Sequence, residues 1–150
     1  DTASKADKHN NYSACTTWLV RGTDYYLLDV LCVRLEYPDL RRRIESHAKK
    51  HGAKRVLIED ASSGTHLIQE LRRGNGIRPL PIRPEGDKIV RAEAQSPKVE
   101  AGHVWLPWLA DFLRGGLAFP YGPHDDQVDS MTQFLAWAQK RPVQIHVARI

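Results

Sequence analysis

"KRVLIEDASSGTHLIQELRRG", residues 54–74, predicts a buried strand followed directly by an amphipathic helix. The apolar run at its start ends abruptly in Glu59 and Asp60, which is typical of an internal strand in a parallel or mixed sheet. A capping serine then opens the helix, whose leucines and isoleucine recur at helical spacing until Gly74. A strand and a helix in this order indicate a layered α/β domain.

Two β-rich runs, SACTTWLV and YYLLDVLCV, precede this unit and are joined at RGTD, which predicts an antiparallel hairpin. A turn formed by Thr23 and Asp24 would place Cys15 opposite Cys32. The two cysteines lack the paired spacing of a zinc site, so we expect buried free thiols.

The rest of the chain alternates helical and extended patterns, and no internal repeat interrupts it. The pattern predicts a mixed α/β domain that extends over the whole chain. The expected elements are a helix over 38–52, an edge strand within 77–84, a helix from 86 that Asp87 caps and Pro97 interrupts, a short strand within 102–107, a short helix over 108–116, and a long helix from about His124 to Lys140.

Composition limits the possible classes of protein. At 150 residues, with 41% hydrophobic and 27% charged residues, the chain fits one globular domain. No apolar run approaches a membrane span, and the first residues lack the apolar core of a signal peptide, so we expect a cytosolic protein without a membrane partner. The formal charge of +4 mildly favours a polyanionic partner such as nucleic acid. Because no initiator Met is present, the chain is either processed or a fragment.

"GPHDDQVDSMTQFL", residues 122–135, crowds three aspartates at the start of the last helix. Asp126 and Asp129 are three residues apart and project on the same side, so their repulsion requires a counter-charge. Helix capping explains one or two of them, and Glu59 and Asp60 alone could be a surface loop. Together, however, these acids would form an oxygen-rich pocket suited to Mg²⁺ or Mn²⁺; otherwise an Arg or Lys network must neutralise them.

Six stretches resemble, in order, the nuclease domain of the large terminase subunit of tailed bacteriophages: DTASKADKHNNYSACTTW, YYLLDVLCVRLEYPDLRR, VLIEDASSGTHLIQEL, GDKIVRAEA, AGHVWLP and FPYGPHDDQVDSMTQFL. The resemblance implies a ribonuclease H-like mixed five-stranded sheet flanked by helices, as a single domain over 1–150. It also implies an upstream ATPase domain in a longer terminase chain, and cutting of double-stranded viral DNA during packaging with two divalent ions, Mg²⁺ or Mn²⁺. Implied partners are the portal protein and the small terminase subunit, in the cytoplasm of the infected bacterium.

The resemblance also implies which residues act. Asp1 matches the acid that follows the family's first strand, although that strand lies outside this numbering. The related resolvases use one further acid, three residues after the last family ligand. The implied catalytic and metal-binding residues are Asp1, Glu59, Asp126 and Asp129.

Other positions of the matching motifs have supporting roles. Asp60 competes with Glu59 as the ligand at the strand end, and we expect Glu59 to reach the metals because adjacent strand residues point to opposite faces. Asp125 and His124 would lie outside the ligand set, Asp125 as the helix cap or a hydrogen-bond partner. Lys88 and Arg91 match a recurrent motif that contacts the scissile phosphate or the DNA backbone, although solvated charges are the alternative for each.

Two other functions remain open at this point. One is a Holliday-junction-resolvase-like nuclease of the same fold, which would prefer four-way junctions to linear duplexes. The other is a catalytically silent module that docks the packaging motor on the portal and needs no metal.

Overall fold

A computed structural model describes residues 13–61, 63–74, 76–107 and 125–140. The elements in these residues follow the predicted order closely, beginning with the hairpin and ending with the long helix. They are β1 (Ser13–Arg21), β2 (Asp24–Val33), α1 (Tyr37–Lys50), β3 (Val56–Glu59), α2 (Ser63–Arg73), β4 (Pro79–Ile82), α3 (Lys88–Glu100), β5 (Val104–Trp105) and α5 (Asp125–Gln139). The short helix expected over 108–116 lies outside the described residues.

The strands confirm a mixed α/β arrangement but do not form one continuous ladder. β1 pairs antiparallel with β2, and β2 pairs parallel with β5. β3 and β4 form a separate parallel pair, with Pro79–Ile82 as the predicted edge strand. The five described strands are therefore grouped as three and two, because no described strand bridges β1 and β3.

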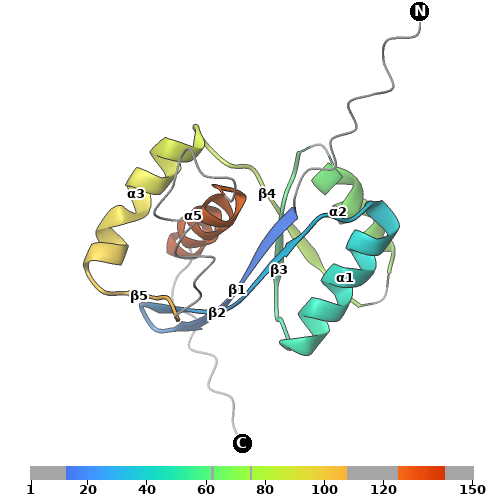
Figure 1. The fold of residues 1–150 in the computed structure, drawn as a ribbon, viewed down its shortest axis with the longest axis horizontal. Helices are drawn as coiled ribbons and strands as arrows, with labels where there is room; N and C mark the ends of the chain where they lie inside the picture. The colour runs from blue at the N-terminus through green and yellow to red at the C-terminus, as the bar shows by residue number, and fades with distance from the viewer. Residues whose placement is uncertain (1–12, 62, 75, 108–124, 141–150) are drawn as a thin grey trace, which may run out of the picture.

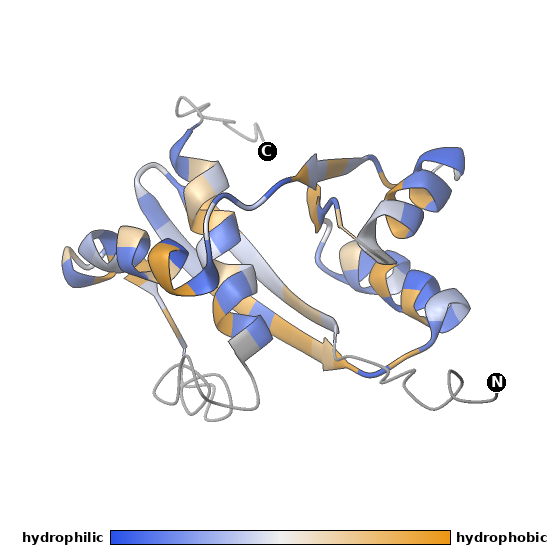
Figure 2. Cartoon of the chain, turned by 90° about the horizontal axis from the view of Figure 1, so that it is seen from above, coloured by the Kyte–Doolittle hydropathy of each residue, from blue (hydrophilic) through white to orange (hydrophobic). Residues whose placement is uncertain are grey.

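Helices cover the strands on two sides (Figure 1). α1 and α2 lie on one side, and α3 and α5 lie on the other, with α5 packed against both α3 and β1. Figure 2 shows that the helices carry hydrophobic and hydrophilic residues on different parts of their surfaces, as amphipathic helices do. The buried hydrophobic residues are Tyr25, Leu27, Leu31, Leu40, Leu67, Ile68, Leu71, Val128 and Leu135. Among the described residues, no helix is both long enough and apolar enough to cross a membrane.

Helix α3 begins as predicted but ends later than expected. The Asp87 carboxylate accepts hydrogen bonds from the backbone amides of Ile89 and Val90, each at 2.9 Å, which confirms the N-cap. Pro97 does not interrupt the helix, which continues to Glu100. A proline removes one backbone donor, and here the turn that follows closes on the Pro97 carbonyl through the Ala101 amide at 3.0 Å.

The hairpin turn lies one residue earlier than predicted. Arg21 pairs with Asp24, so the turn consists of Gly22 and Thr23, with Gly22 at a φ of 58° that favours glycine. Cys15 consequently lies opposite Leu31 rather than Cys32. Both cysteines are free, as predicted, but they are half-buried rather than fully buried.

A β-bulge in β2 then changes which side chains share a face. Thr17 pairs with Asp29 and Trp18 pairs with Leu27, which leaves Leu28 as the extra residue. An extra residue shifts the alternation of the strand by one position. Trp18 can therefore stack on Phe134 of α5, at 4.9 Å between ring centroids, while the paired Thr17 and Asp29 contact the end of α1.

Candidate active site

The candidate site begins at the carboxyl end of β3, where Glu59 is the last strand residue. Its exposed carboxylate accepts a hydrogen bond from the Gln133 side-chain amide, with 2.9 Å between Nε2 and Oε2. The carboxyl end of a parallel strand is where open α/β sheets place their ligands. Glu59 is therefore directed toward α5, and its predicted role as a metal ligand stays a prediction.

Gln133 joins Glu59 to the acidic start of α5. The same Nε2 atom donates to Asp129 Oδ2 at 3.0 Å, so one amide group lies between two carboxylates. Gln133 is not among the residues that the sequence predicts for the site. Its position four residues after Asp129 was the available signal, because residues at that spacing share a helix face.

Asp129 is paired with Arg91 of α3. The Arg91 Nε and NH2 atoms donate to Asp129 Oδ1 at 3.0 and 2.6 Å, and its NH1 atom donates to the Gly86 carbonyl at 2.6 Å. The two side chains are only 13% and 20% exposed, so little solvent screens the pair. Arg91 thus supplies a counter-charge to Asp129, one of the crowded acids. A contact with DNA, as predicted, would require the guanidinium to be accessible to the substrate instead.

Asp126 is exposed and lines the same cavity as Glu59 and Asp129. Within the described residues, these three acids do not form a group whose ligand atoms all lie within 4.8 Å of one another. Glu59 and Asp129 therefore share one hydrogen-bond donor, the Gln133 amide, whereas Asp126 lines the cavity beside them.

Asp60 has different partners from Glu59. Its Oδ1 accepts from the Thr65 hydroxyl at 3.0 Å, and its Oδ2 accepts from Arg83 NH2 at 3.2 Å. Its backbone amide extends the pairing with β4 through the Ile82 carbonyl at 2.8 Å. The Asp60 carboxylate is thus engaged by α2 and by the segment after β4, whereas the Glu59 carboxylate bonds Gln133 of α5.

The close approach of α2 to the end of β3 depends on Gly64. A Cβ atom at this position would lie 2.0 Å from the backbone carbonyl oxygen of Glu59, far inside van der Waals contact. Only a glycine leaves room for this packing. Gly64 therefore determines where the strand end, and with it Glu59, is held.

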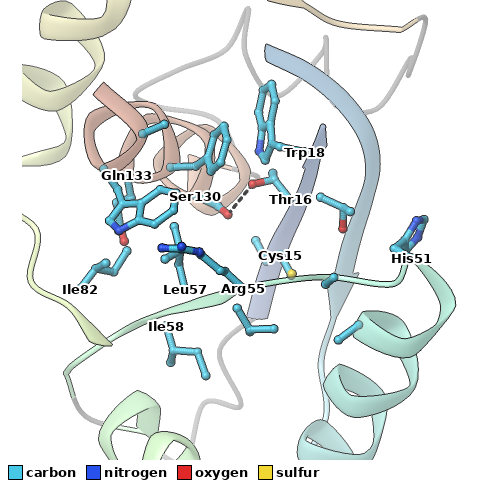
Figure 3. A pocket seen from close by; sticks show the side chains of 18 of the residues that line it. Cys15, Thr16, Trp18, His51, Arg55, Leu57, Ile58, Ile82, Ser130 and Gln133 are labelled. Atoms are coloured by element: carbon cyan, nitrogen blue, oxygen red, sulfur yellow. Dashed lines mark hydrogen bonds between the residues drawn. The ribbon is translucent and has the colours of Figure 1, made fainter. Parts of the chain in front are cut away.

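A cavity of about 1800 Å³ lies between β1 and β3, and Glu59, Asp126 and Asp129 are among the residues that line it. In Figure 3, the side chains of Thr16 on β1 and Ser130 on α5 point toward each other. The Thr16 and Ser130 hydroxyls are hydrogen-bonded at 3.0 Å, which ties β1 to the acidic helix.

The remaining predicted residues lie elsewhere or outside the described part. Lys88 is exposed at the first position of α3, and Asp125 is the first residue of α5. Asp1 and His124 lie outside the described residues, so their predicted roles stay predictions. The described site is thus a line of contacts from Glu59 through Gln133 and Asp129 to Arg91.

The chemistry of this donor set fits hard divalent cations. Carboxylate oxygens are the ligands that Mg²⁺ and Mn²⁺ prefer, and Glu59, Asp126 and Asp129 present them along one cavity. The Gln133 amide and the Arg91 guanidinium contribute positive polarity beside the same carboxylates. Such a site can bind divalent cations. Without them, the Arg91–Asp129 pair has a purely structural role.

We expect Arg91→Gln to lower the free energy of unfolding by about 1–3 kcal/mol, because Asp129 loses a partly buried, two-nitrogen partner. Arg73→Gln is the matched control: its bond to Glu70 is 2.8 Å long, but Arg73 is 76% exposed, so about 0–1 kcal/mol is expected. Urea denaturation measures both variants. Equal losses would mean that Arg91 does not stabilise Asp129, and reduced DNA binding without any loss of stability would favour the predicted DNA contact.

A family model described as "Terminase RNaseH-like domain" matches residues 1–137. Comparison with curated proteins gives no match. A solved structure described as the large terminase nuclease from thermophilic phage G20c with bound zinc is 19% identical, with a TM-score of 0.61, over 86% of this chain and 82% of that chain. At this identity the likeness supports the fold, and it agrees with the expected ribonuclease H-like arrangement.

Proposed function

Because the chain belongs to the terminase RNaseH-like domain family, we propose that it is a metal-dependent endonuclease that cuts double-stranded viral DNA during genome packaging. The observation that carries the proposal is the alignment of Glu59, Asp126 and Asp129 along one cavity, with Gln133 bridging the first and last. Carboxylates that line one cavity repel one another, and a bound cation would relieve that repulsion.

We propose Asp1, Glu59, Asp126 and Asp129 as the residues that hold two divalent ions, Mg²⁺ or Mn²⁺. A pair of such ions supplies an activated water and stabilises the attacking and leaving oxygens of phosphodiester hydrolysis. The carboxylates supply the negative charge that makes this binding favourable. Asp60, Asp125 and His124 would support the ligands from outside, and for Asp60 the bonds to Thr65 and Arg83 support that role.

Gln133 and Arg91 would position the acids. The amide of Gln133 holds Glu59 and Asp129 near each other, and the fork of Arg91 orients Asp129 from α3. This connection makes the spacing of the acids depend on how α3 packs on α5. Lys88, exposed at the start of α3, remains the better placed of the two predicted contacts to the DNA backbone.

We also propose the wider context that the family suggests. The chain would be the nuclease domain of a longer terminase, with an ATPase domain upstream, and would work with the portal protein and the small terminase subunit in the infected cell. Its basic composition, with a formal charge of +4, favours DNA as the substrate.

The silent docking module is the second candidate, because Arg91 already neutralises Asp129 and the three acids do not converge within 4.8 Å in the described residues. A Mn²⁺ titration by calorimetry, combined with a supercoiled-plasmid cleavage assay, separates the two. The nuclease predicts Mn²⁺ binding in or below the millimolar range and Mn²⁺-dependent cutting. No binding and no cutting would favour the docking module. Faster cutting of four-way junctions than of linear duplex would instead favour the resolvase-like enzyme.

Asp126→Asn should abolish this cutting while leaving the fold intact, because it removes a proposed ligand and keeps the size of the side chain. Asp125→Asn is the control at the adjacent position and should cause a milder loss. Circular dichroism verifies that both variants fold. Full activity in Asp126→Asn would remove Asp126 from the site, and equal losses would show that the wrong member of the pair was chosen.

A further inference from the structure

A second group of metal-type ligands lies where α1 ends against the β1–β2 hairpin. Asp29, His47 and His51 each offer a ligand atom within 4.8 Å of the other two. In the part of the chain that the structure describes, no other group of three such side chains meets this closely. None of the three has a role in the proposed nuclease site.

The backbone brings these side chains together from two elements. His47 and His51 are four residues apart at the end of α1 and therefore share a side of the helix, with 4.7 Å between their ring centroids. The bulge at Leu28 pairs Asp29 with Thr17, on the face that meets this helix end. The Thr17 hydroxyl lies 2.8 Å from His47 Nε2 and holds the buried ring in place.

One of the three distances between ligand atoms is already close to that in a coordinated site, and the other two are within 4.8 Å. His51 Nε2 lies 2.9 Å from Asp29 Oδ2. Two ligands on a tetrahedral zinc ion, each with a bond of about 2.0–2.1 Å, lie about 3.3 Å apart. A shift of a few tenths of an ångström therefore separates this pair from a chelating geometry. Lys50 Nζ, 3.0 Å from the same oxygen, is 67% exposed and free to withdraw into solvent.

We propose that Asp29, His47 and His51 form a binding site for zinc, distinct from the acidic site. Two imidazoles and one carboxylate, with a fourth position left for water, are a ligand set typical of Zn²⁺, whereas Mg²⁺ prefers oxygen ligands alone. The ion would join the hairpin to α1 and so stabilise the packing of the strands on this helix.

The protonation states at neutral pH suit this ligand set. Burial, and then the neighbouring His51, hold the pKa of His47 below its usual value, so the ring is neutral. Hydrogen bonding to Lys50 is the largest cause that lowers the pKa of Asp29 to about 2, and the carboxylate is therefore charged. A bound cation would therefore contact the neutral His47 ring and the charged Asp29 carboxylate. It would replace Lys50 as the positive partner of Asp29.

The two sites are spatially separate. His51 precedes β3, whereas Glu59 ends it, and in Figure 3 His51 and Gln133 lie on opposite sides of the pocket. The strand Val56–Glu59 spans about 10 Å at the usual rise per residue. A substitution that removes the ligands of one site should therefore leave the other site intact, so an ion that still binds can be assigned to the unchanged site.

The test is a Zn²⁺ titration by competition with a chromogenic chelator, with the thermal midpoint and the visible spectrum of the Co²⁺ form as further readouts. We expect the wild type to bind Zn²⁺ at this site, to gain thermal stability, and to give the intense visible bands of nitrogen-ligated tetrahedral Co²⁺. His51→Asn and Asp29→Asn should each weaken this binding by more than about 100-fold, since loss of an outer partner alone costs about 10–100-fold.

Two variants provide the controls. His103→Asn removes a histidine whose Nδ1 lies 2.9 Å from Asp24 Oδ1, a similar His–Asp pair without a second histidine, and should leave Zn²⁺ affinity unchanged. Glu59→Gln should keep the zinc site while losing the proposed nuclease metals, which separates the two proposals. Absence of Zn²⁺ binding in the wild type, or affinity retained in both His51→Asn and Asp29→Asn, would overturn the assignment.

Discussion

Glu59→Gln is expected to eliminate nicking of supercoiled plasmid at every Mn²⁺ concentration, whereas Asp60→Asn should retain cutting at a rate lowered about 10–100-fold. The two acids are adjacent, but only the Glu59 carboxylate is linked to α5, through the Gln133 amide at 2.9 Å. Asp60 bonds Thr65 and Arg83 instead. Removing the Glu59 charge takes away a proposed metal ligand, while removing the Asp60 charge loosens the loop that positions it.

The pair of variants controls for nonspecific effects, because each replaces a carboxylate by the amide of the same size. Calorimetry with Mn²⁺ should show weakened binding in Glu59→Gln and nearly normal binding in Asp60→Asn. If Asp60→Asn is inactive and Glu59→Gln retains most activity, the assignment at this strand end is wrong by one residue. Gln133→Leu extends the comparison, since it breaks the link to Glu59 while keeping both acids.

Gly64→Ala should destabilise the protein by about 1–3 kcal/mol or more and reduce metal binding along with it. Alanine normally favours a helix over glycine by about 1 kcal/mol, so the expected sign is the reverse of the usual one. The reason is steric: the added Cβ would lie 2.0 Å from the Glu59 carbonyl oxygen, which is backbone and cannot rotate away. Relief of this clash must move either α2 or the end of β3.

Gly76→Ala is the matched control, because nothing lies within 4 Å of a Cβ at that position. Urea denaturation should show a stability near that of the wild type for this variant and a large loss for Gly64→Ala. Mn²⁺ affinity, measured under conditions where both variants are folded, then reports whether Glu59 has moved. A Gly64→Ala protein as stable as the wild type would mean that α2 does not approach the strand end this closely.

Much of the architecture follows from local pattern. The apolar run before Glu59, the helical spacing after it and the Asp87 cap all depend on residues near one another in sequence, and the structure confirms them. Two local predictions were wrong: the hairpin turn lies at Gly22 and Thr23 rather than at Thr23 and Asp24, and α3 continues past Pro97 instead of being interrupted there. At the hairpin, the positive φ of Gly22 selects the earlier turn, which is a local effect. Pro97 is unfavourable inside a helix, so the packing of α3 on α5 must offset its local cost.

The sequence by itself determined the order of strands and helices, the stripe of buried residues on α2, and the motifs that resemble the terminase nuclease family. Only the tertiary structure decided which partner each charge has. Arg91 meets Asp129 across 38 residues, and Gln133 meets Glu59 across 74. The zinc-type cluster likewise depends on one bulge at Leu28. Hydrophobic periodicity specifies which face of an element is buried, but a contact between side chains of different elements depends on their packing and register, which local spacing does not encode.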